Sequence, residues 1–465
     1  MLPVRINFLS SMAREFSLAL SSKAQLASRN PRGSKMSIVK RRLKVKGYYI
    51  AEGPLKIKLV NGRASLTGKM LLEGEEVVIP LAKATLLEVE GEAELEVMGG
   101  GTLSQIEEST IPREWQSFID NLASRGEGVI FVLGSVDSGK TFFITYTANK
   151  LLEAGAKVSV IDGDIGQSDV GPPTAIGLGY LERQVVFLEE VGLASAYFVG
   201  STTPAGHLLP MVVGTAKLIH EARAHGGIVL VDTPGMVYGG PARALQIYCI
   251  EATKPDMVVA LQRERELEHL LKQLKALEVE VTRLPASPYV RLRDRKDRKF
   301  LRERAFHNYF TRRGTAKLTL SLDKVAIIGS FLGTGERAPA EITQAVQSAT
   351  GSSVEYCEIS QDAIVVVLSD KQPIRNAYLK LRNIFRDRTV KVIRKGFEKG
   401  LVAGLIGEKS TCLDIGVLQA IDFHRGEIVL ISPWKTPEAV KAVKIGCVRL
   451  DENFREVERL EPGFL

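Results

Sequence analysis

Apolar residues follow a period of two through the first part of the chain. From residue 37 to about 105 they form short runs, and glutamate occupies every second position from 88 to 96. This alternation is typical of a strand with one solvent-facing side. Asn61 and Gly62 lie between two apolar runs and predict a hairpin turn, whereas the glycines at 99–101 interrupt the pattern and indicate a linker. We therefore expect a β-sandwich-like N-terminal domain over residues 37–105.

The periodicity changes between residues 128 and about 290. Short apolar runs now alternate with stretches of helical character, which predicts a parallel sheet with helices on both faces. Ligands of such a sheet gather at the carboxyl ends of its strands. A connecting helix is expected over residues 112–124, and strands are expected over residues 129–133, 157–162, 196–200, 228–232, 257–261 and 279–283.

Residues 291–313 form a separate segment with helical spacing, in which ten basic residues stand against three acidic ones. Leu301, Ala305 and Tyr309 share one face of the expected helix, and Arg298 and Arg302 lie one turn apart. From residue 315 onward short apolar runs return, which predicts a second, mostly-β domain over residues 314–465. Its clearest strands are expected at 318–320, 325–328, 363–367 and 428–431.

The first expected strand of the middle region leads into Gly134-x-x-x-x-Gly139-Lys140-Thr141, the pattern of a phosphate-binding P-loop. Its backbone N–H groups and the start of the next helix can cradle phosphates. Lys140 can reach the β- and γ-phosphates, and the Thr141 hydroxyl can hold Mg²⁺. A chance glycine turn is the alternative, but every fixed position matches. The expected cofactor-binding residues of this loop are Gly134, Ser135, Val136, Asp137, Ser138, Gly139, Lys140 and Thr141.

Carboxylates follow two further strands. Asp162 and Asp164 come at the end of the second strand, where they suit metal binding and orientation of a nucleophile. Asp232 ends the fourth strand, as in a Walker B motif that binds Mg²⁺ directly or through water. Either member of the first pair could instead cap the following segment. The Asp232-x-x-Gly235 form also occurs in GTPases, so it does not separate a kinase from a switch.

Residues 253–256 match the sequence of the T-K-x-D motif that binds guanine in GTPases. That motif should follow a strand, but here it precedes one. We interpret it as a solvated turn. The basic segment has two readings as well: a solvated helix face, or a lid whose arginines neutralise charge on a phosphoryl group in transfer.

Composition limits the expected class of partner and the expected location of the protein. The chain has 465 residues and a formal net charge of +8, which weakly favours an acidic partner such as nucleic acid. Its four cysteines form no C-x-x-C pair, so a reducing, cytoplasmic location is expected. No apolar run is long enough for a transmembrane helix. Residues 1–36 resemble an organelle transit peptide in composition, but a disordered basic tail or a true start at Met36 is the preferred reading.

Taken together, these motifs resemble the polynucleotide 5′-hydroxyl-kinase family, which acts in tRNA splicing and other RNA processing. The resemblance covers most of the chain after about residue 45. The family's D-x-D-x-G-Q motif is matched from Asp162 to Gln167, and its G-x-T-x-P segment by Gly200, Thr202 and Pro204. Its T-x-G-W clasp keeps Thr233 and Gly235 but has Met236 in place of tryptophan. Its lid R-x-x-x-R is matched by Arg298 and Arg302.

The resemblance implies an ATP- and Mg²⁺-dependent kinase that phosphorylates the 5′-hydroxyl of RNA, with DNA as an open alternative. It assigns catalytic roles to Lys140, Asp164, Arg298 and Arg302, with Asp164 accepting or orienting the 5′-hydroxyl. Thr141, Asp162 and Asp232 would form the metal shell. Thr233, Gly235 and Met236 would cover the nucleotide. Gln167, Thr202 and Pro204 would meet the nucleic acid.

The expected fold is therefore α/β: a central P-loop NTPase domain with a parallel sheet, over residues 106–313, between the two β domains. Two rival functions stay open at this point. One is a P-loop switch GTPase, and the other is a nucleotide-binding scaffold without catalysis. Protein partners cannot be named from the sequence, and no membrane role is expected.

Overall fold

A computed structural model describes residues 40–289, 293–369 and 374–464. The basic segment at 1–36, with its alternative start at Met36, lies outside these residues. The chain divides into two compact units, described separately below. The first comprises Met1–Asp162, Leu178–Leu193 and Ile219–Leu301, and the second comprises Gly163–Gly177, Ala194–Leu218 and Arg302–Leu465.

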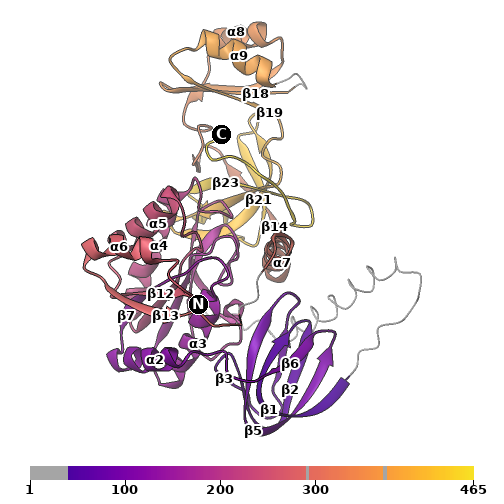
Figure 1. Cartoon of the computed structure of the whole chain (residues 1–465). Helices are drawn as coiled ribbons and strands as arrows, with labels where there is room; N and C mark the ends of the chain where they lie inside the picture. Colours follow the sequence, from indigo (N-terminus) through magenta and orange to yellow (C-terminus); the bar gives the residue numbers. More distant parts are fainter. Residues whose placement is uncertain (1–39, 290–292, 370–373, 465) are drawn as a thin grey trace. The chain divides into compact units, whose positions relative to one another are not determined.

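The first unit begins with an antiparallel sheet of order β3-β2-β5-β1-β6, with β4 paired to β2 (Figure 1). Alternate residues of its long strands are buried in one core that includes Ile57, Leu59 and Leu95. This agrees with the half-buried strands expected from the period of two. The strands are β1 (Lys40–Glu52), β2 (Leu55–Leu66), β3 (Lys69–Met70), β4 (Glu76–Ile79), β5 (Ala84–Gly99) and β6 (Thr102–Ile106).

Two expectations for this domain were wrong. Asn61 and Gly62 do not form a hairpin turn but lie within β2, where the register against β5 shifts on either side of Asn61. Gly62 has φ +96, so the glycine absorbs the bulge. The glycines at 99–101 are not a free linker either. A Cβ on Gly101 would lie 1.9 Å from the Glu52 carbonyl oxygen, so the chain passes tightly against the end of β1.

The P-loop region of the first unit is built on parallel strands in the order β8-β11-β7-β12-β13. The order continues beyond β8 with β9 and β10. The strands are β7 (Gly128–Leu133), β8 (Val158–Asp162), β9 (Ala175–Tyr180), β10 (Leu193–Phe198), β11 (Ile228–Asp232), β12 (Met257–Gln262) and β13 (Glu280–Pro285). The helices are α2 (Arg113–Arg125), α3 (Lys140–Glu153), α4 (Leu208–His225), α5 (Gly240–Thr253) and α6 (Glu268–Leu274).

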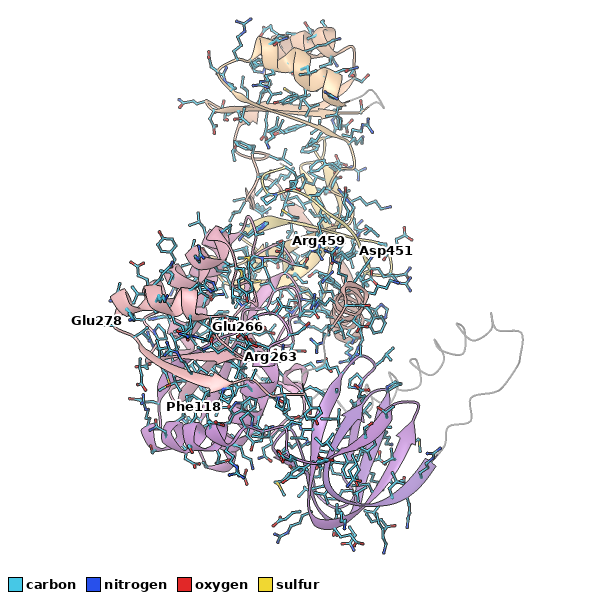
Figure 2. The ribbon with its side chains drawn as sticks, viewed as in Figure 1. Phe118, Arg263, Glu266, Glu278, Asp451 and Arg459 are labelled. Atoms are coloured by element: carbon cyan, nitrogen blue, oxygen red, sulfur yellow. The ribbon has the colours of Figure 1, made fainter. Side chains whose placement is uncertain are left out.

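The apolar runs predicted as strands are therefore confirmed, and β9 was missed. Strands β8 and β11 are buried along their whole length, as parallel strands covered on both faces must be. Helix α2 packs beside α3 (Figure 1). Its Trp115 also contacts β13, because the indole N–H donates to the Pro285 carbonyl at 2.8 Å. Phe118 on the same helix, labelled in Figure 2, packs on Phe143.

The N-terminal β domain is joined to this core by a buried amide. The Asn149 side chain on α3 donates to the carbonyls of Thr67 (2.8 Å) and Val185 (2.7 Å), and it accepts the N–H of Val185 at 2.9 Å. Because every one of these polar groups is satisfied, the contact between domain and core is specific.

The second unit contains α7 from Arg302 onward and a largely antiparallel sheet of order β14-β22-β21-β20-β23-β15, with β24 paired to β23. Its elements include α7 (Arg295–Arg313), β14 (Ala316–Ser321), β15 (Ala326–Ile328), β20 (Leu401–Ile406), β21 (Cys412–Asp422), β22 (Glu427–Ser432), β23 (Ala442–Leu450) and β24 (Glu456–Arg459). The expected strands near 318, 325 and 428 are confirmed.

A four-stranded α/β module, residues 336–394, interrupts this sheet in sequence. Its order is β16-β17-β18-β19, and α8 and α9 cover one face (Figure 1). In β18, Ile364 and Val366 face the helices while Val365 and Val367 belong to the core of the larger sheet. The two helices were not predicted from the sequence. The module consists of β16 (Glu336–Arg337), α8 (Ala340–Thr350), β17 (Val354–Ile359), β18 (Ala363–Leu368), α9 (Ile374–Ile384) and β19 (Thr389–Arg394).

Short 3₁₀ helices complete the described structure: η1 (Leu188–Glu190), η2 (Lys275–Leu277), η3 (Glu408–Ser410) and η4 (Pro437–Ala439). Among the residues described, no helix is both long enough and apolar enough to cross a bilayer.

Candidate active site

The P-loop forms as expected between β7 and α3. Gly139 lies in the left-handed region at φ +86 and starts the helix, so Lys140 occupies its first turn. Lys140 Nζ donates to the carbonyls of Gly134 and Ser135, at 3.0 Å each. The ammonium thus lies over the loop that is to receive phosphate. A bound phosphate would have to replace these carbonyls as the hydrogen-bond acceptor of the Lys140 ammonium.

Two glycines permit close backbone packing around the loop. A Cβ on Gly134 would lie 2.3 Å from Ser138 Oγ. One on Gly235 would lie 2.8–3.0 Å from three atoms of Val136, so the expected clasp segment touches the P-loop directly. Thr233 Oγ1 donates to the Val132 carbonyl at 2.7 Å, and the Met236 carbonyl accepts from Gln246 at 3.3 Å. Clasp residues Thr233, Gly235 and Met236 are therefore fixed beside the loop.

Oxygen ligands for a hard cation converge behind the loop. Thr141 Oγ1 donates to Asp232 Oδ2 at 2.7 Å. Asp232 is directly paired in register with Asp162 on the neighbouring parallel strand, and each residue is 2% exposed. No cluster of three or more His, Cys, Asp or Glu residues suited to a metal occurs in the described part of the chain. Mg²⁺ does not need one, because it keeps several waters and takes one or two carboxylates plus substrate phosphates. The residues present fit that ion.

Asp137 of the P-loop is held by three arginines, which was not predicted from the sequence. Its carboxylate Oδ2 accepts from Arg298 Nη2 at 2.6 Å and from the Arg293 backbone N–H at 3.2 Å. Its carbonyl accepts from Arg263 Nη2 at 3.0 Å; Figure 2 labels Arg263 and the nearby Glu266 after β12. Asp137 itself has φ +55. The predicted lid residue Arg298 therefore meets the P-loop through a carboxylate.

The acidic motif continues in the second unit as a tight loop. Asp164 Oδ1 accepts the backbone N–H groups of Gly166 and Gln167, both at 3.1 Å. A Cβ on Gly166 would lie 2.6 Å from the Thr202 carbonyl oxygen, so this glycine allows the two motifs to touch. Gln167 Nε2 donates to the Gly166 carbonyl at 2.9 Å. The Asp164 carboxylate is thereby fixed in orientation by its own loop.

The G-x-T-x-P segment lies against this loop. The Gly200 carbonyl accepts the Cys447 N–H at 2.7 Å, and Gly200 has φ +95. Thr202 Oγ1 is buried and has no hydrogen-bond partner within the described ranges. Pro204 closes the segment by accepting the His207 N–H at 2.9 Å. A buried hydroxyl with unused hydrogen-bonding capacity beside the acidic loop suits a polar ligand.

The second lid residue, Arg302, forms a largely buried ion pair in the second unit. Arg302 Nε donates to Glu456 Oε2 at 2.9 Å, with side-chain exposures of 12% and 9%. Arg459, labelled in Figure 2, donates to the other carboxylate oxygen at 2.7 Å. Burial acts to raise the pKa of Glu456, but the bonds from Arg459 and Arg302 outweigh it and hold this pKa below its ordinary value.

The rest of the same helix is anchored by apolar and polar contacts. Phe306 and Phe310 are fully buried in a cluster with Phe198 and strands of the C-terminal sheet. Thus the aromatic pair, and not the face of Leu301 and Ala305, carries the main burial. Tyr309 donates to Asp414 at 2.8 Å, and burial raises the pKa of both groups above their ordinary values.

The T-K-x-D match is a turn, as expected. Lys254 ends α5 at φ +45, and Asp256 Oδ2 accepts the Val129 N–H at 2.8 Å. The carboxylate is therefore engaged in starting a strand and is not at the carboxyl edge of the sheet where a base would be read.

The candidate residues thus form two groups, one in each unit. The first unit brings together the P-loop, its clasp, the metal-binding oxygens and Arg298. The second unit brings together the acidic loop, with Asp164 and Gln167, and the G-x-T-x-P segment. It also contains Arg302, which is bound to Glu456.

Comparison with known proteins links these motifs to one family. Residues 134–312 match the family described as mRNA cleavage and polyadenylation factor CLP1 P-loop. The polyribonucleotide 5′-hydroxyl-kinase of Pyrococcus furiosus is 30% identical over 335 residues, which cover 71% of this chain and 90% of that protein. The kinase of the same name from Thermococcus kodakarensis is 31% identical over 350 residues, covering 75% and 95%.

Solved structures show the same fold. A complex of wild-type Clp1p with a segment of Pcf11p matches with a TM-score of 0.59 at 14% identity, covering 88% of this chain and 98% of that one. A second Clp1p structure, which describes an extended interface with Pcf11p, matches with a TM-score of 0.61. At this identity the likeness concerns the fold alone.

Proposed function

The chain belongs to the polyribonucleotide 5′-hydroxyl-kinase family, and we propose that it transfers the γ-phosphate of ATP to the 5′-hydroxyl of RNA. The observation that carries this proposal is the intact pairing of the P-loop with its acidic partners: Lys140 over the loop, and Thr141 at 2.7 Å from Asp232. A lysine, a hydroxyl and carboxylates are the residue types that P-loop enzymes use for phosphoryl transfer, and this supports the proposal.

Nucleotide binding falls to the P-loop and its clasp. The backbone N–H groups of the loop and the start of α3 supply positive electrostatic potential for the phosphates. Lys140 would exchange two carbonyl acceptors for β- and γ-phosphate oxygens. Thr233, Gly235 and Met236 are held against the loop and would limit the access of water. Methionine can replace tryptophan here because it is apolar and adaptable.

Thr141, Asp232 and Asp162 would hold Mg²⁺. When bound, the ion supplies charge neutralisation across the β- and γ-phosphates. Asp162 and Asp232 lie side by side at the strand ends, so either can bind the ion directly or through a water molecule. The buried position of both carboxylates favours a cation beside them.

Asp164 would accept the proton of the acceptor. As the 5′-oxygen forms its bond to the γ-phosphorus, the bond from that phosphorus to the β–γ bridging oxygen breaks. ADP leaves with that oxygen, and the 5′-hydroxyl proton passes to the Asp164 carboxylate. The two N–H groups that bind Asp164 Oδ1 hold the carboxylate in place for this transfer. Gln167, Thr202 and Pro204 would contact the terminal nucleotide.

Arg298 and Arg302 would stabilise the charge that spreads over the transferring group. A planar guanidinium can contact two phosphate oxygens at once, and this is why arginine suits the role. Arg298 already meets the P-loop at Asp137. Arg302 would have to give up or share its bonds with Glu456 to reach a phosphate.

The rival functions are less well supported. A switch GTPase needs a guanine-reading carboxylate, and Asp256 is engaged at the Val129 backbone. A scaffold without catalysis would not need Lys140, Asp164 and both arginines. The four cysteines are all free thiols, which supports the cytoplasmic location proposed for the enzyme.

Acceptor dependence of nucleotide turnover tests the proposal. Purified protein is incubated with ATP or GTP, each with a 5′-hydroxyl RNA, with the same RNA bearing a 5′-phosphate, or alone. We expect ADP to form rapidly only with ATP and the 5′-hydroxyl RNA. GTP turnover that is indifferent to RNA would favour the switch, and tight ATP binding without turnover in any mixture would favour the scaffold.

A further inference from the structure

Helix α9 (Ile374–Ile384) presents an unusual exposed face within the C-terminal α/β module. Ala377 and Leu381 are buried against the module's sheet. Arg375, Leu379 and Arg382 follow the opposite face at helical spacing and are exposed, with Leu379 49% exposed. Lys380 lies exposed beside them. These four residues are called the α9 surface below.

Among the residues that the structure describes, the cations of the α9 surface have no acidic partner. Helix α9 contains no Asp or Glu, and residues 374–395 contain eight basic residues against a single acidic one. Arg375, Lys380 and Arg382 form no ion pair or side-chain hydrogen bond within the described parts of the chain. Their side chains are therefore available to a partner.

Exposed cations along β1, by contrast, have acidic partners. Along β1, Lys40, Arg42 and Lys44 each pair with a glutamate of β5, on Glu96, Glu94 and Glu92. Even the basic helix α7 places Asp297 and Glu303 among its arginines. Helix α9 differs from both elements, because no acidic residue stands among its basic residues.

Stability of the fold does not explain this arrangement. Arg375 lies in the first turn, where the helix dipole disfavours a cation. Leu379 adds exposed apolar area that the module does not bury. The surface therefore carries a small cost in the free protein, which a bound polyanion would offset.

We propose that the α9 surface binds phosphates of the RNA substrate outside its reacting 5′ end. This rests on the proposed function, which makes RNA the acidic ligand that the enzyme must hold. None of the residues assigned to the reacting end belongs to the module at 336–394. Arg375, Lys380 and Arg382 would contact the phosphates of the backbone, which carry no sequence information directly. Leu379 lies between them and can contact a sugar or a base.

The test compares a long and a short acceptor. The triple variant Arg375→Ala, Lys380→Ala, Arg382→Ala is assayed with a 5′-hydroxyl oligonucleotide of a few nucleotides and with a longer unstructured RNA of the same 5′ sequence. A matched variant, Lys317→Ala, Lys324→Ala, Lys435→Ala, removes three exposed lysines from the same unit. A charge-preserving variant, Arg375→Lys with Arg382→Lys, keeps the field of the surface. Thermal unfolding checks that each variant is folded.

We expect the α9 triple variant to raise Kd for the long RNA about tenfold at low salt. The slope of log Kd against log salt concentration should fall by about 2, because each lost contact to a single-strand phosphate removes about 0.7. The kcat and KM for the short oligonucleotide should not change. The lysine control and the charge-preserving variant should stay close to wild type.

Several outcomes would overturn the inference. One is a Kd and a salt dependence for the long RNA that the triple variant leaves unchanged. This result would overturn the inference even if the variant lost binding to an acidic protein. Another is an equal loss for long and short acceptors, which would assign the residues to the reacting end. Wild-type protein that binds long RNA through α9 but phosphorylates neither acceptor would instead count against the proposed function. Should the triple variant unfold, Arg382→Gln alone is measured, with a proportionally smaller expected shift.

Discussion

Arg298 Nη2 lies 2.6 Å from Asp137 Oδ2, so a carboxylate of the P-loop itself binds the first arginine of the lid motif. The Asp137 side chain is 14% exposed and that of Arg298 is 30% exposed, which screens the pair only partly. The backbone and the side chain of Asp137 therefore serve different purposes. Asp137 shapes the phosphate-binding loop through its backbone, and it places Arg298 at the edge of that loop through its side chain.

The first prediction concerns this pair. Arg298→Ala should lower kcat by about 100-fold or more, the scale for removing one preorganised charge donor. Asp137→Asn should lower kcat less, because Arg298 keeps its charge but loses the carboxylate that places it. In a double-mutant cycle the two effects should be clearly non-additive. Fully additive losses would show that Asp137 does not act through Arg298.

The second prediction concerns Lys140. Its ammonium faces the phosphate-binding loop and not the apolar core, so Lys140→Ala should leave the unfolding temperature nearly unchanged. Transfer should fall by at least about 100-fold, since a main contact to the transferring charge is lost. Single-turnover kinetics and thermal unfolding measure the two effects. Near-normal transfer by a folded Lys140→Ala protein would remove the P-loop from the mechanism.

The third prediction concerns Mg²⁺. Thr141→Ala removes a proposed metal ligand, whereas Thr141→Ser retains the hydroxyl at 2.7 Å from Asp232. Thr141→Ala and Asp232→Asn should both raise the Mg²⁺ concentration needed for half-maximal activity, and Thr141→Ser should not. Direct Mn²⁺ binding, followed by electron paramagnetic resonance with ATP present, gives a readout independent of turnover. Equal metal affinity in all three variants would contradict this ligand set.

The fourth prediction concerns the buried pair of Arg302 and Glu456. Removing one partner of a buried ion pair costs about 3 kcal/mol of unfolding free energy. Glu456→Gln should therefore destabilise the second unit, and the exposed pair partner Glu458 offers the matched control Glu458→Gln, with a loss of under about 1 kcal/mol. If Arg302 is also catalytic, Arg302→Ala should lower kcat well below that of Glu456→Gln at similar stability.

The same pair gives a pH dependence with a definite sign. The pKa of Glu456 is held below its ordinary value in the folded protein. Its contribution is therefore fully present above the unfolded pKa of about 4.3 and is lost as the pH falls through the folded value. The free energy of unfolding of the wild type, measured with urea, should decrease below about pH 4.3. The decrease should be smaller for Glu456→Gln. Parallel pH profiles for the two proteins would rule out this role of Glu456.

Local sequence was sufficient for the part of the site that is contiguous in the chain. The P-loop and the run from Asp162 to Gln167 are each one strand end and one loop, so spacing alone locates them. That Asp162 and Asp232 lie at the same edge of the sheet also follows from sequence, because parallel strands bring their carboxyl ends to one edge. Their direct pairing on neighbouring strands does not, since sequence gives no strand order. Glu456 could not be found this way, since it lies 154 residues from Arg302.

The fold was predicted less completely where tertiary contacts override local signals. Asn61 and Gly62 carry a strong turn signal, yet β2 continues through them because β5 offers pairing on both sides of the bulge. Strand β9 was hidden by two glycines, Gly177 and Gly179. Helices α8 and α9 were overlooked although signals were present: Pro339 and Gly351 bound α8, and apolar residues recur at helical spacing in α9.

The most direct test of the central claim is to identify the reaction product. A 5′-hydroxyl RNA is incubated with the purified protein and ATP labelled at the γ-position, and the RNA is then analysed by mass spectrometry and by end-specific digestion. The account predicts that the RNA gains one phosphate, that the label is on the 5′ oxygen, and that Asp164→Asn abolishes the gain while ATP still binds. An RNA of unchanged mass, with wild-type protein that is folded and binds ATP, would contradict it.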